Sequence, residues 1–294
     1  MTTTEATTIT NRAMLVRLSI SNWRARKYSR NVSDQVNEEY AAEKEASRVN
    51  KHLFAGDPIH KALCSAADAA RVAHYTQTLP WEDGGEGWRL LPTSNWIAYA
   101  DAMRVKRADW MRALDAFVDA YPDLRAGAEA KLGKLYDARD YPDARRVRER
   151  FDWAIDFSPV PDAGDLRVDL PAEQVATIAA SVSNRLASAT AAAMEDAWAR
   201  LREAVARIKD RTADPKSPLR GNLIAQARET VEILGRLNLT QDARLDEMRE
   251  MVERELTGDD VESLRENDAL RAATAVKAGD ILAKMSAFYG TPAA

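Results

Sequence analysis

The chain has 294 residues, of which 46% are hydrophobic and 30% charged, and its formal net charge is -4. This length can bury the core of one large or two ordinary domains. The charge excludes a basic field over the whole molecule, so nucleic-acid binding would need a local patch. The single cysteine, Cys64, excludes an intramolecular disulfide and fits a reducing compartment. Because no apolar run approaches the roughly 18 residues of a membrane span, we expect no membrane partner.

The N-terminal third predicts a tail, a strand and a helix. Residues 1–12 are polar and Thr-rich, with no apolar core of a signal peptide, which predicts a disordered tail. In residues 13–21, Val16, Leu18 and Ile20 alternate with polar side chains, as in a half-buried strand. Ser33 is a typical N-cap, and we expect a helix from it to about Leu53.

The middle of the chain predicts two longer helices and a small sheet. Helices are expected over about 58–78 and from 93 or 94 to about 120, and one or two short helices over 124–150. Residues 79–92, which hold two tryptophans among Gly and Pro, predict a folded loop. Residues 151–160 alternate aromatic or aliphatic with polar side chains, which predicts a strand, and 166–170 predict its return strand.

A single helical pattern runs over residues 173–211. Its apolar positions recur about every 3.67 residues, closer to an 11-residue repeat than to the heptad of a left-handed coiled coil. We therefore expect a nearly straight helix that packs closely through alanines near its middle. Further helices are predicted over 219–237, 241–256 and 260–288. The apolar positions are Val175, Ile178, Val182, Leu186, Ala189, Ala193, Ala197, Leu201, Val205 and Ile208.

Together these patterns predict a mainly α fold of the α+β class. Long antiparallel helices or a helical bundle would be joined by a small antiparallel sheet of two to three strands, formed by residues 14–20 with 151–170. The expected division is a tail over 1–12, an α+β domain over 13–170 and a helical domain over 171–294.

The basic N-terminal segment is the clearest candidate binding surface. No acidic residue lies between Glu5 and Asp34, and this stretch interleaves cations with aromatic side chains. Guanidinium groups neutralise phosphates and aromatic rings stack on unpaired bases, so the segment fits nucleic acid. Alternatively, the aromatics belong to the core and the cations are solvated or pair with acids elsewhere in the chain. A third possibility is that the segment binds an acidic protein. The candidate residues are Arg17, Trp23, Arg24, Arg26, Lys27, Tyr28 and Arg30, with Arg12 nearby.

Other clusters of reactive side chains favour structural interpretations. His60, Cys64 and Asp68 share one helix face and are all zinc-ligand types, but they span too many turns for one ion, so no metal site is predicted. Asp152 and Asp156 on one strand could hold Mg²⁺ or form its solvated face. No catalytic signature is found, so we predict no catalytic residue, no cofactor and no enzyme activity.

Several strings resemble a known family. Residues 20–28 (ISNWRARKY), 50–53 (NKHL), 79–81 (LPW) and 87–92 (GWRLLP) are similar to a domain-of-unknown-function family of tailed bacteriophages and prophages. The resemblance covers most of residues 13–256. It implies a phage protein made in the cytoplasm of an infected bacterium, with an AAA+ ATPase as a possible partner. It carries over no catalytic residues.

Three functions are therefore weighed. The first is a non-enzymatic phage assembly or adaptor protein, homo-oligomeric or bound to a phage or host protein, with Trp198, Leu201 and Val205 as the candidate oligomer interface. The alternative is a DNA- or RNA-binding protein of phage replication, recombination or counter-defence that uses residues 12–30. The third is a Mg²⁺ enzyme that acts through Asp152 and Asp156.

Overall fold

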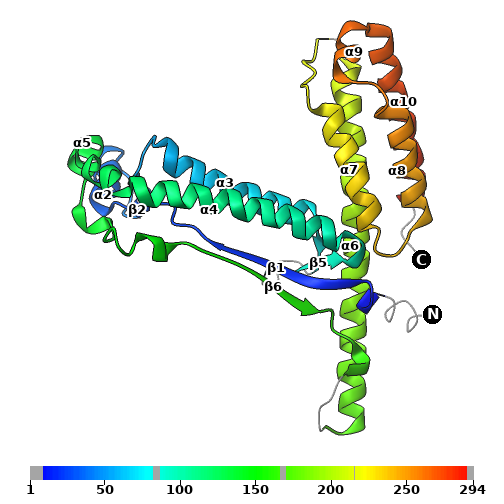
Figure 1. Ribbon diagram of the computed structural model, residues 1–294, viewed down its shortest axis with the longest axis horizontal. Helices are drawn as coiled ribbons and strands as arrows, with labels where there is room; N and C mark the ends of the chain where they lie inside the picture. The colour runs from blue at the N-terminus through cyan, green and yellow to red at the C-terminus, as the bar shows by residue number, and fades with distance from the viewer. Residues whose placement is uncertain (1–8, 82–86, 166–169, 215, 290–294) are drawn as a thin grey trace. The chain divides into compact units, whose positions relative to one another are not determined.

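The computed structural model describes residues 9–81, 87–165, 170–214 and 216–289. The described chain is mainly helical with a small antiparallel sheet, which confirms the predicted α+β class (Figure 1). It divides into two compact units, each with its own hydrophobic core. Unit 1 comprises Met1–Arg17, Tyr75–Tyr99 and Phe157–Ala294, and unit 2 comprises Leu18–His74 and Ala100–Asp156.

Four strands form the larger sheet, in the order β4-β5-β1-β6. The strand β1 lies beside β6, as the sequence predicts, and pairs antiparallel with β5, where Leu15 is opposite Leu90. The pair β4 and β5 was expected to be part of a loop; it pairs because Leu79 and Leu90 are fully buried opposite each other. Residues 166–169 of the predicted return strand lie outside the described residues. The bounds are β1 Ala13–Ser21, β4 Leu79–Pro80, β5 Arg89–Pro92 and β6 Asp152–Pro159.

The prediction of a tail over residues 1–12 is wrong for its last four residues. Ile9 is buried in the core of unit 1, and the Arg12 carbonyl accepts a hydrogen bond of 2.8 Å from the Thr93 amide. Burial of the Ile9 side chain and the backbone hydrogen bond to the Arg12 carbonyl therefore hold residues 9–12 in place. Residues 1–8 lie outside the described part of the chain.

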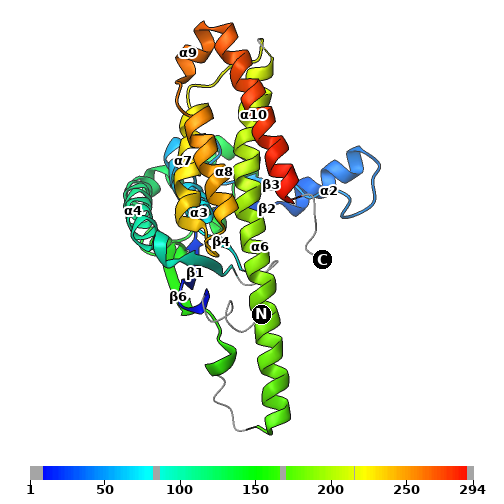
Figure 2. The ribbon, with the colours of Figure 1, turned by 90° about the vertical axis from the view of Figure 1, so that its right-hand side faces the viewer.

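A bundle of four helices makes up most of unit 1. The C-terminal half of α6 packs against α7 and α10, and α8 closes the ring by packing against the same two helices (Figure 2). Leu201, Val205 and Ile208 of α6 are fully buried, as the helical period predicts. The helices are α6 Ala172–Ala213, α7 Leu223–Leu237, α8 Ala243–Leu256, α9 Val261–Glu266 and α10 Asp268–Tyr289, with short 3₁₀ helices η1 Thr93–Asn95 and η5 Ala163–Asp165.

Arginines satisfy the carbonyls that helices leave unpaired at their C-terminal ends. Arg200 of α6 donates to the carbonyls of Tyr75, Thr76 and Thr78, at 3.2, 2.9 and 2.8 Å, where α3 ends. Arg271 of α10 is buried and donates to the Arg211 and Ser217 carbonyls at 2.9 and 2.7 Å. A cation at this end also complements the helix dipole. These contacts fix helix ends against neighbouring helices of unit 1.

Unit 2 is built around aromatic side chains of α4 and of the turn that precedes α3. The Phe117 ring lies edge-on to Phe54 and Tyr121, with centroids 5.6 and 5.8 Å apart. Such edge-to-face contacts add to the free energy of area burial. The elements are β2 Arg26–Tyr28, α2 Arg30–Glu39, β3 Asn50–His52, α3 Pro58–Thr76, α4 Trp96–Ala126, α5 Ala128–Leu132, and the 3₁₀ helices η2 Gly133–Leu135, η3 Ala138–Asp140 and η4 Val147–Arg150.

The helix expected over residues 33–53 is much shorter in the structure. It ends at Glu39, and the chain returns through a loop to β3. Ser33 accepts a hydrogen bond from the Val49 amide at 2.9 Å instead of capping the helix, and Asn37 accepts one from the Ser47 amide at 3.0 Å. Glu45 has a positive φ of 73°, which no helix allows. Polar side chains of α2 thus hold the loop that replaces the predicted helix.

The units differ from the predicted division at residue 170. The boundary falls within β1, α3, α4 and β6, so both units draw on segments far apart in the sequence. Strand pairing brings residues 13–17 and 89–92 together with the chain that precedes the long helix. Among the described helices, none combines the length and hydropathy that crossing a bilayer requires.

Candidate functional site

The predicted basic segment separates into a buried part and an exposed part. Trp23 packs edge-on against Phe54, with ring centroids 5.6 Å apart, and also lies 6.2 Å from Tyr121. It is therefore partly buried, and its ring packs against the aromatic core of unit 2. Arg24 is exposed but paired with Asp68, and Ala25 is buried with a positive φ of 50° that redirects the chain before the exposed residues 26–28.

The helix α3 holds the first part of this segment in place. Asp68 accepts two hydrogen bonds from the Arg24 guanidinium, at 2.7 and 3.3 Å, and Arg71 donates to the Ile20 carbonyl at 2.9 Å. The His60 Nε2 atom lies 3.0 Å from the Trp23 carbonyl oxygen. Asp68 and His60 therefore position the backbone of residues 20–24, which agrees with a structural interpretation of the His60, Cys64 and Asp68 face.

The Cys64 thiol is held in its neutral form. Burial raises its pKa, and the negative charge of Asp68 raises it further, although the nearby Arg24 acts in the opposite direction. The Cys64 Sγ atom lies 3.8 Å from His60 Nε2, the atom that faces the Trp23 carbonyl. An activated cysteine needs a lowered pKa. The pair is therefore arranged for packing and not for nucleophilic attack.

The exposed part of the basic segment forms one strand of a two-stranded ribbon. In β2, Arg26 lies opposite His52, Lys27 opposite Lys51, and Tyr28 opposite Asn50 of β3. Directly opposite residues of an antiparallel pair share a face, and successive residues alternate between faces. Lys51 forms an ion pair of 2.6 Å with Asp140 and donates to the Leu135 carbonyl, so this side chain is turned toward the protein, whereas Lys27 opposite it is exposed.

The other face of this ribbon is exposed and carries cations around an aromatic ring. We call Arg26, Tyr28, Asn50 and His52, together with Arg48, the ribbon face; all five are exposed. The Arg48 guanidinium carbon lies 4.9 Å from the Tyr28 ring centroid, a cation–π contact. Sequence reasoning missed Arg48, Asn50 and His52 because it placed them in the helix expected over 33–53. The NKHL string at residues 50–53 was the available signal.

The two remaining residues of the predicted set are placed elsewhere. Arg30 begins α2 and lies 3.8 Å from Asp34, an exposed pair in adjacent turns. Arg17 belongs to unit 1, where its guanidinium carbon lies 4.8 Å from the Trp88 ring centroid. Arg17 is therefore in the other unit from the ribbon face.

The Asp152 carboxylate, at the start of β6, has a local role. Asp152 Oδ1 accepts a hydrogen bond of 2.8 Å from the amide of Trp153. In the described part of the chain, no group of three or more His, Cys, Asp or Glu residues is arranged to hold a metal ion. Phe157, expected on the buried face of this strand, is 48% exposed and packs edge-on against Trp96 at 5.2 Å.

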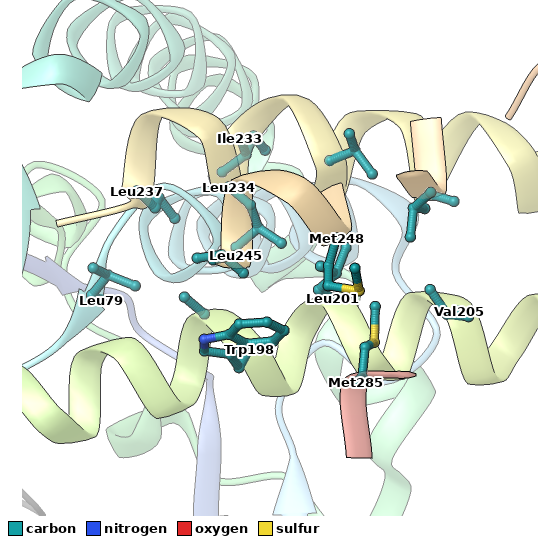
Figure 3. Close-up of a cluster of buried hydrophobic side chains, with 14 of the residues drawn as sticks. Leu79, Trp198, Leu201, Val205, Ile233, Leu234, Leu237, Leu245, Met248 and Met285 are labelled. Atoms are coloured by element: carbon teal, nitrogen blue, oxygen red, sulfur yellow. The ribbon is translucent and has the colours of Figure 1, made fainter. Parts of the chain in front are cut away.

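The candidate oligomer interface lies inside the bundle. Trp198, Leu201 and Val205 are 6%, 0% and 0% exposed, and side chains of α7, α8 and α10 surround them (Figure 3). Trp198 Nε1 also donates to Asp242 at 3.2 Å. This stripe is therefore removed as a surface for a second copy, because helices of the same chain already cover it.

The N-terminal half of α6 is the part of the long helix that the bundle leaves uncovered (Figure 2). No side chain of residues 172–185 is buried, and Ile178 is 37% exposed. Residues 174–194 hold only one charged side chain, Arg185. One face of this half lines a groove of about 720 Å³ with Pro80 and Trp81. We call it the α6 groove; its helical lining is Thr177, Ala180, Ser181, Asn184, Arg185, Ser188, Ala189 and Ala192.

Comparisons with protein-family models, with curated proteins and with solved structures find no match to this chain. The phage-family resemblance of the strings at residues 20–28 and 50–53 therefore stays a prediction. Two exposed surfaces are therefore the candidates for function: the ribbon face in unit 2 and the α6 groove in unit 1.

Proposed function

We propose that the protein is a non-enzymatic assembly protein whose copies associate through the N-terminal half of α6, which presents the α6 groove and, beside it, the apolar stripe of Val175, Ile178 and Val182. The observation that carries this proposal is the uncovered N-terminal half of α6, with a single charge in residues 174–194. The resemblance to phage and prophage proteins adds an origin to the proposal: the cytoplasm of an infected bacterium. An AAA+ ATPase is its proposed partner and would act on the self-associated protein.

The apolar stripe supports association because it continues past the bundle. Leu201 and Val205 are buried by neighbouring helices, whereas Val175, Ile178 and Val182 follow the same period and lack full cover. A helix draws most of its stability from packing of its apolar face. A partner that covers these three side chains would therefore stabilise the N-terminal half of α6.

The composition of this half favours a second copy as the occupant. A face with almost no charge needs no opposite charge on its partner, so it is complementary to itself. Its alanines and serines let two helix axes approach closely. A two-fold axis would place two α6 helices antiparallel, with the same residues on each side and opposed helix dipoles. A partner protein of different sequence is the alternative occupant that the test must exclude.

Reactive side chains that suggested chemistry have structural tasks, which also supports a role in binding. His60 and Asp68 hold the backbone that leads to the ribbon face, and burial keeps the Cys64 thiol neutral. These contacts hold the side chains of His60, Cys64 and Asp68 against other atoms of the protein. The proposal therefore assigns these three residues to the scaffold.

Light scattering coupled to gel filtration tests the association. We expect the full chain to be a dimer at micromolar concentration, and Ile178→Glu with Ser181→Glu to raise the dimer dissociation constant at least about 100-fold, since a buried unpaired carboxylate costs several kcal/mol. Both positions are exposed in the single chain, so the fold should persist. Circular dichroism verifies it.

The matched control is Ala273→Glu with Val276→Glu, two exposed positions of α10 with the same spacing. This variant should remain a dimer. A wild-type chain that stays monomeric at about 100 μM, or a dimer that both variants weaken equally, would refute association through the α6 groove.

A further inference from the structure

We infer that the ribbon face binds single-stranded nucleic acid, with Tyr28 as a stacking platform and Arg26 and Arg48 as phosphate contacts. This inference concerns unit 2 and is independent of the proposed association through unit 1. It differs from the set suggested by sequence, because Trp23 and Arg24 are excluded and Arg48, Asn50 and His52 are added.

Rigid support of the ribbon is the first argument. The Leu53 amide donates to the Ala25 carbonyl at 2.8 Å and the Ser29 amide donates to the Val49 carbonyl at 3.0 Å, one bond at each end of the strand pair. The opposite face is anchored by Lys51, which is largely buried in its ion pair with Asp140. A short ribbon alone is marginally stable, so these contacts hold the exposed face in one geometry before a ligand arrives.

The second argument is that the cations of this face have no carboxylate partner. No ion pair of Arg26 or Arg48 is found among the described residues, whereas Arg24, Arg30 and Lys51 each have one. No acidic residue occurs in β2 or β3, and Asp140, which lies beside β3, is paired with Lys51. Two guanidinium groups without counter-charges can each neutralise a phosphate.

The third argument selects unpaired strands over duplexes. Tyr28 is 42% exposed, and Arg48 lies over its ring. Aromatic rings and guanidinium planes both stack on bases that are not already stacked in a duplex. Asn50 lies directly opposite Tyr28 and presents an amide beside the ring, where it can bond to a base edge. Phosphate contacts alone would not explain an exposed ring at the centre of this face.

The experiment measures fluorescence anisotropy of labelled 20-nucleotide single-stranded DNA, single-stranded RNA of the same sequence, and the DNA duplex, with the full chain. We expect both single strands to bind more tightly than the duplex. The affinity should fall with salt at a log–log slope of about -1.4 from two phosphate contacts. Arg26→Gln with Arg48→Gln should weaken binding at least about tenfold at 50 mM salt and flatten the slope.

Two matched controls distinguish the effect of the ribbon face on binding from the effect of net charge and from that of any exposed aromatic ring. Arg104→Gln with Arg107→Gln removes two exposed cations from α4, and Tyr40→Ala removes a ring that is 76% exposed. Both should bind like the wild type, while Tyr28→Ala should lose about tenfold. Absence of single-strand binding, equal affinity for the duplex, or equal losses in the test and control variants would each overturn the inference.

Discussion

Polar side chains of α3 determine which part of the basic segment is exposed. Asp68 holds Arg24 and Arg71, and His60 faces the Trp23 carbonyl, so the backbone is fixed up to the point where Ala25 turns it. The Arg24–Asp68 pair is about half exposed, so it contributes about 1 kcal/mol or less to stability. Its effect is on geometry: it fixes the chain between Trp23, which packs against the core, and the exposed cations that follow.

At the residue scale, the environment of Cys64 predicts slow alkylation. Because burial raises the thiol pKa, the thiolate fraction at any pH below that pKa is smaller than in the unfolded chain. We expect iodoacetamide to modify native protein at pH 8 at least about tenfold more slowly than urea-unfolded protein. The midpoint of the rate against pH should also lie higher in the native protein.

Arg24 gives this prediction an internal control. Its positive charge lowers the Cys64 pKa, so Arg24→Gln should move the midpoint of alkylation to still higher pH. Mass spectrometry of the modified peptide would measure both rates. A native thiol that reacts faster than the unfolded one would indicate an activated nucleophile. That result would contradict a structural role for Cys64 and favour a catalytic one.

At the scale of elements, the sequence predicts those parts whose side chains repeat with a regular period. The apolar stripe from Leu186 to Ile208 predicts the long helix. The alternation of apolar with polar side chains around Val16 predicts β1, and the same alternation around Trp153 predicts β6. The short strands β4 and β5 escape prediction because two and four residues cannot show a period. The helix expected after Ser33 fails because that hydroxyl bonds to a loop amide 16 residues away, a contact with no local signal.

The end of α6 provides a test of one such non-local contact. Arg271 is 6% exposed and donates to the main-chain carbonyls of Arg211, in the last turn of α6, and of Ser217, in the loop that follows. Arg271→Met should lower the free energy of unfolding in urea by about 3 kcal/mol, because several buried acceptors lose their donor at once. Arg271→Lys should lower the free energy of unfolding by a smaller amount, since one ammonium group cannot reach all of these carbonyls.

Arg202 is the matched control for this change. It is exposed on α6, and Arg202→Met should change the free energy of unfolding by about 0.5 kcal/mol or less. If Arg271→Met costs as little as Arg202→Met, the arginine does not hold the end of the helix. The contact between α6 and α10 would then depend on apolar packing alone.

On the scale of the whole molecule, the two candidate surfaces belong to different units. The α6 groove is lined by unit 1 and the ribbon face lies in unit 2, and each unit has a separate hydrophobic core. Sequence reasoning placed the boundary between the two folded domains at residue 170 because the predicted array of helices begins there. It could not foresee that β1 and β6 would join distant segments, since pairing between strands depends on contacts that no local pattern encodes.

This separation predicts that association and nucleic-acid binding can be removed independently. Substitutions on surfaces without shared partners are additive, so Ile178→Glu with Ser181→Glu should abolish the dimer and leave the affinity for a short single strand of about 10 nucleotides within about twofold. Arg26→Gln with Arg48→Gln should do the reverse. Such a short strand avoids the gain in avidity that a dimer would have on a longer one. If either pair of substitutions removed both properties, the two surfaces would have to be coupled through the chain, and neither could be assigned its function alone.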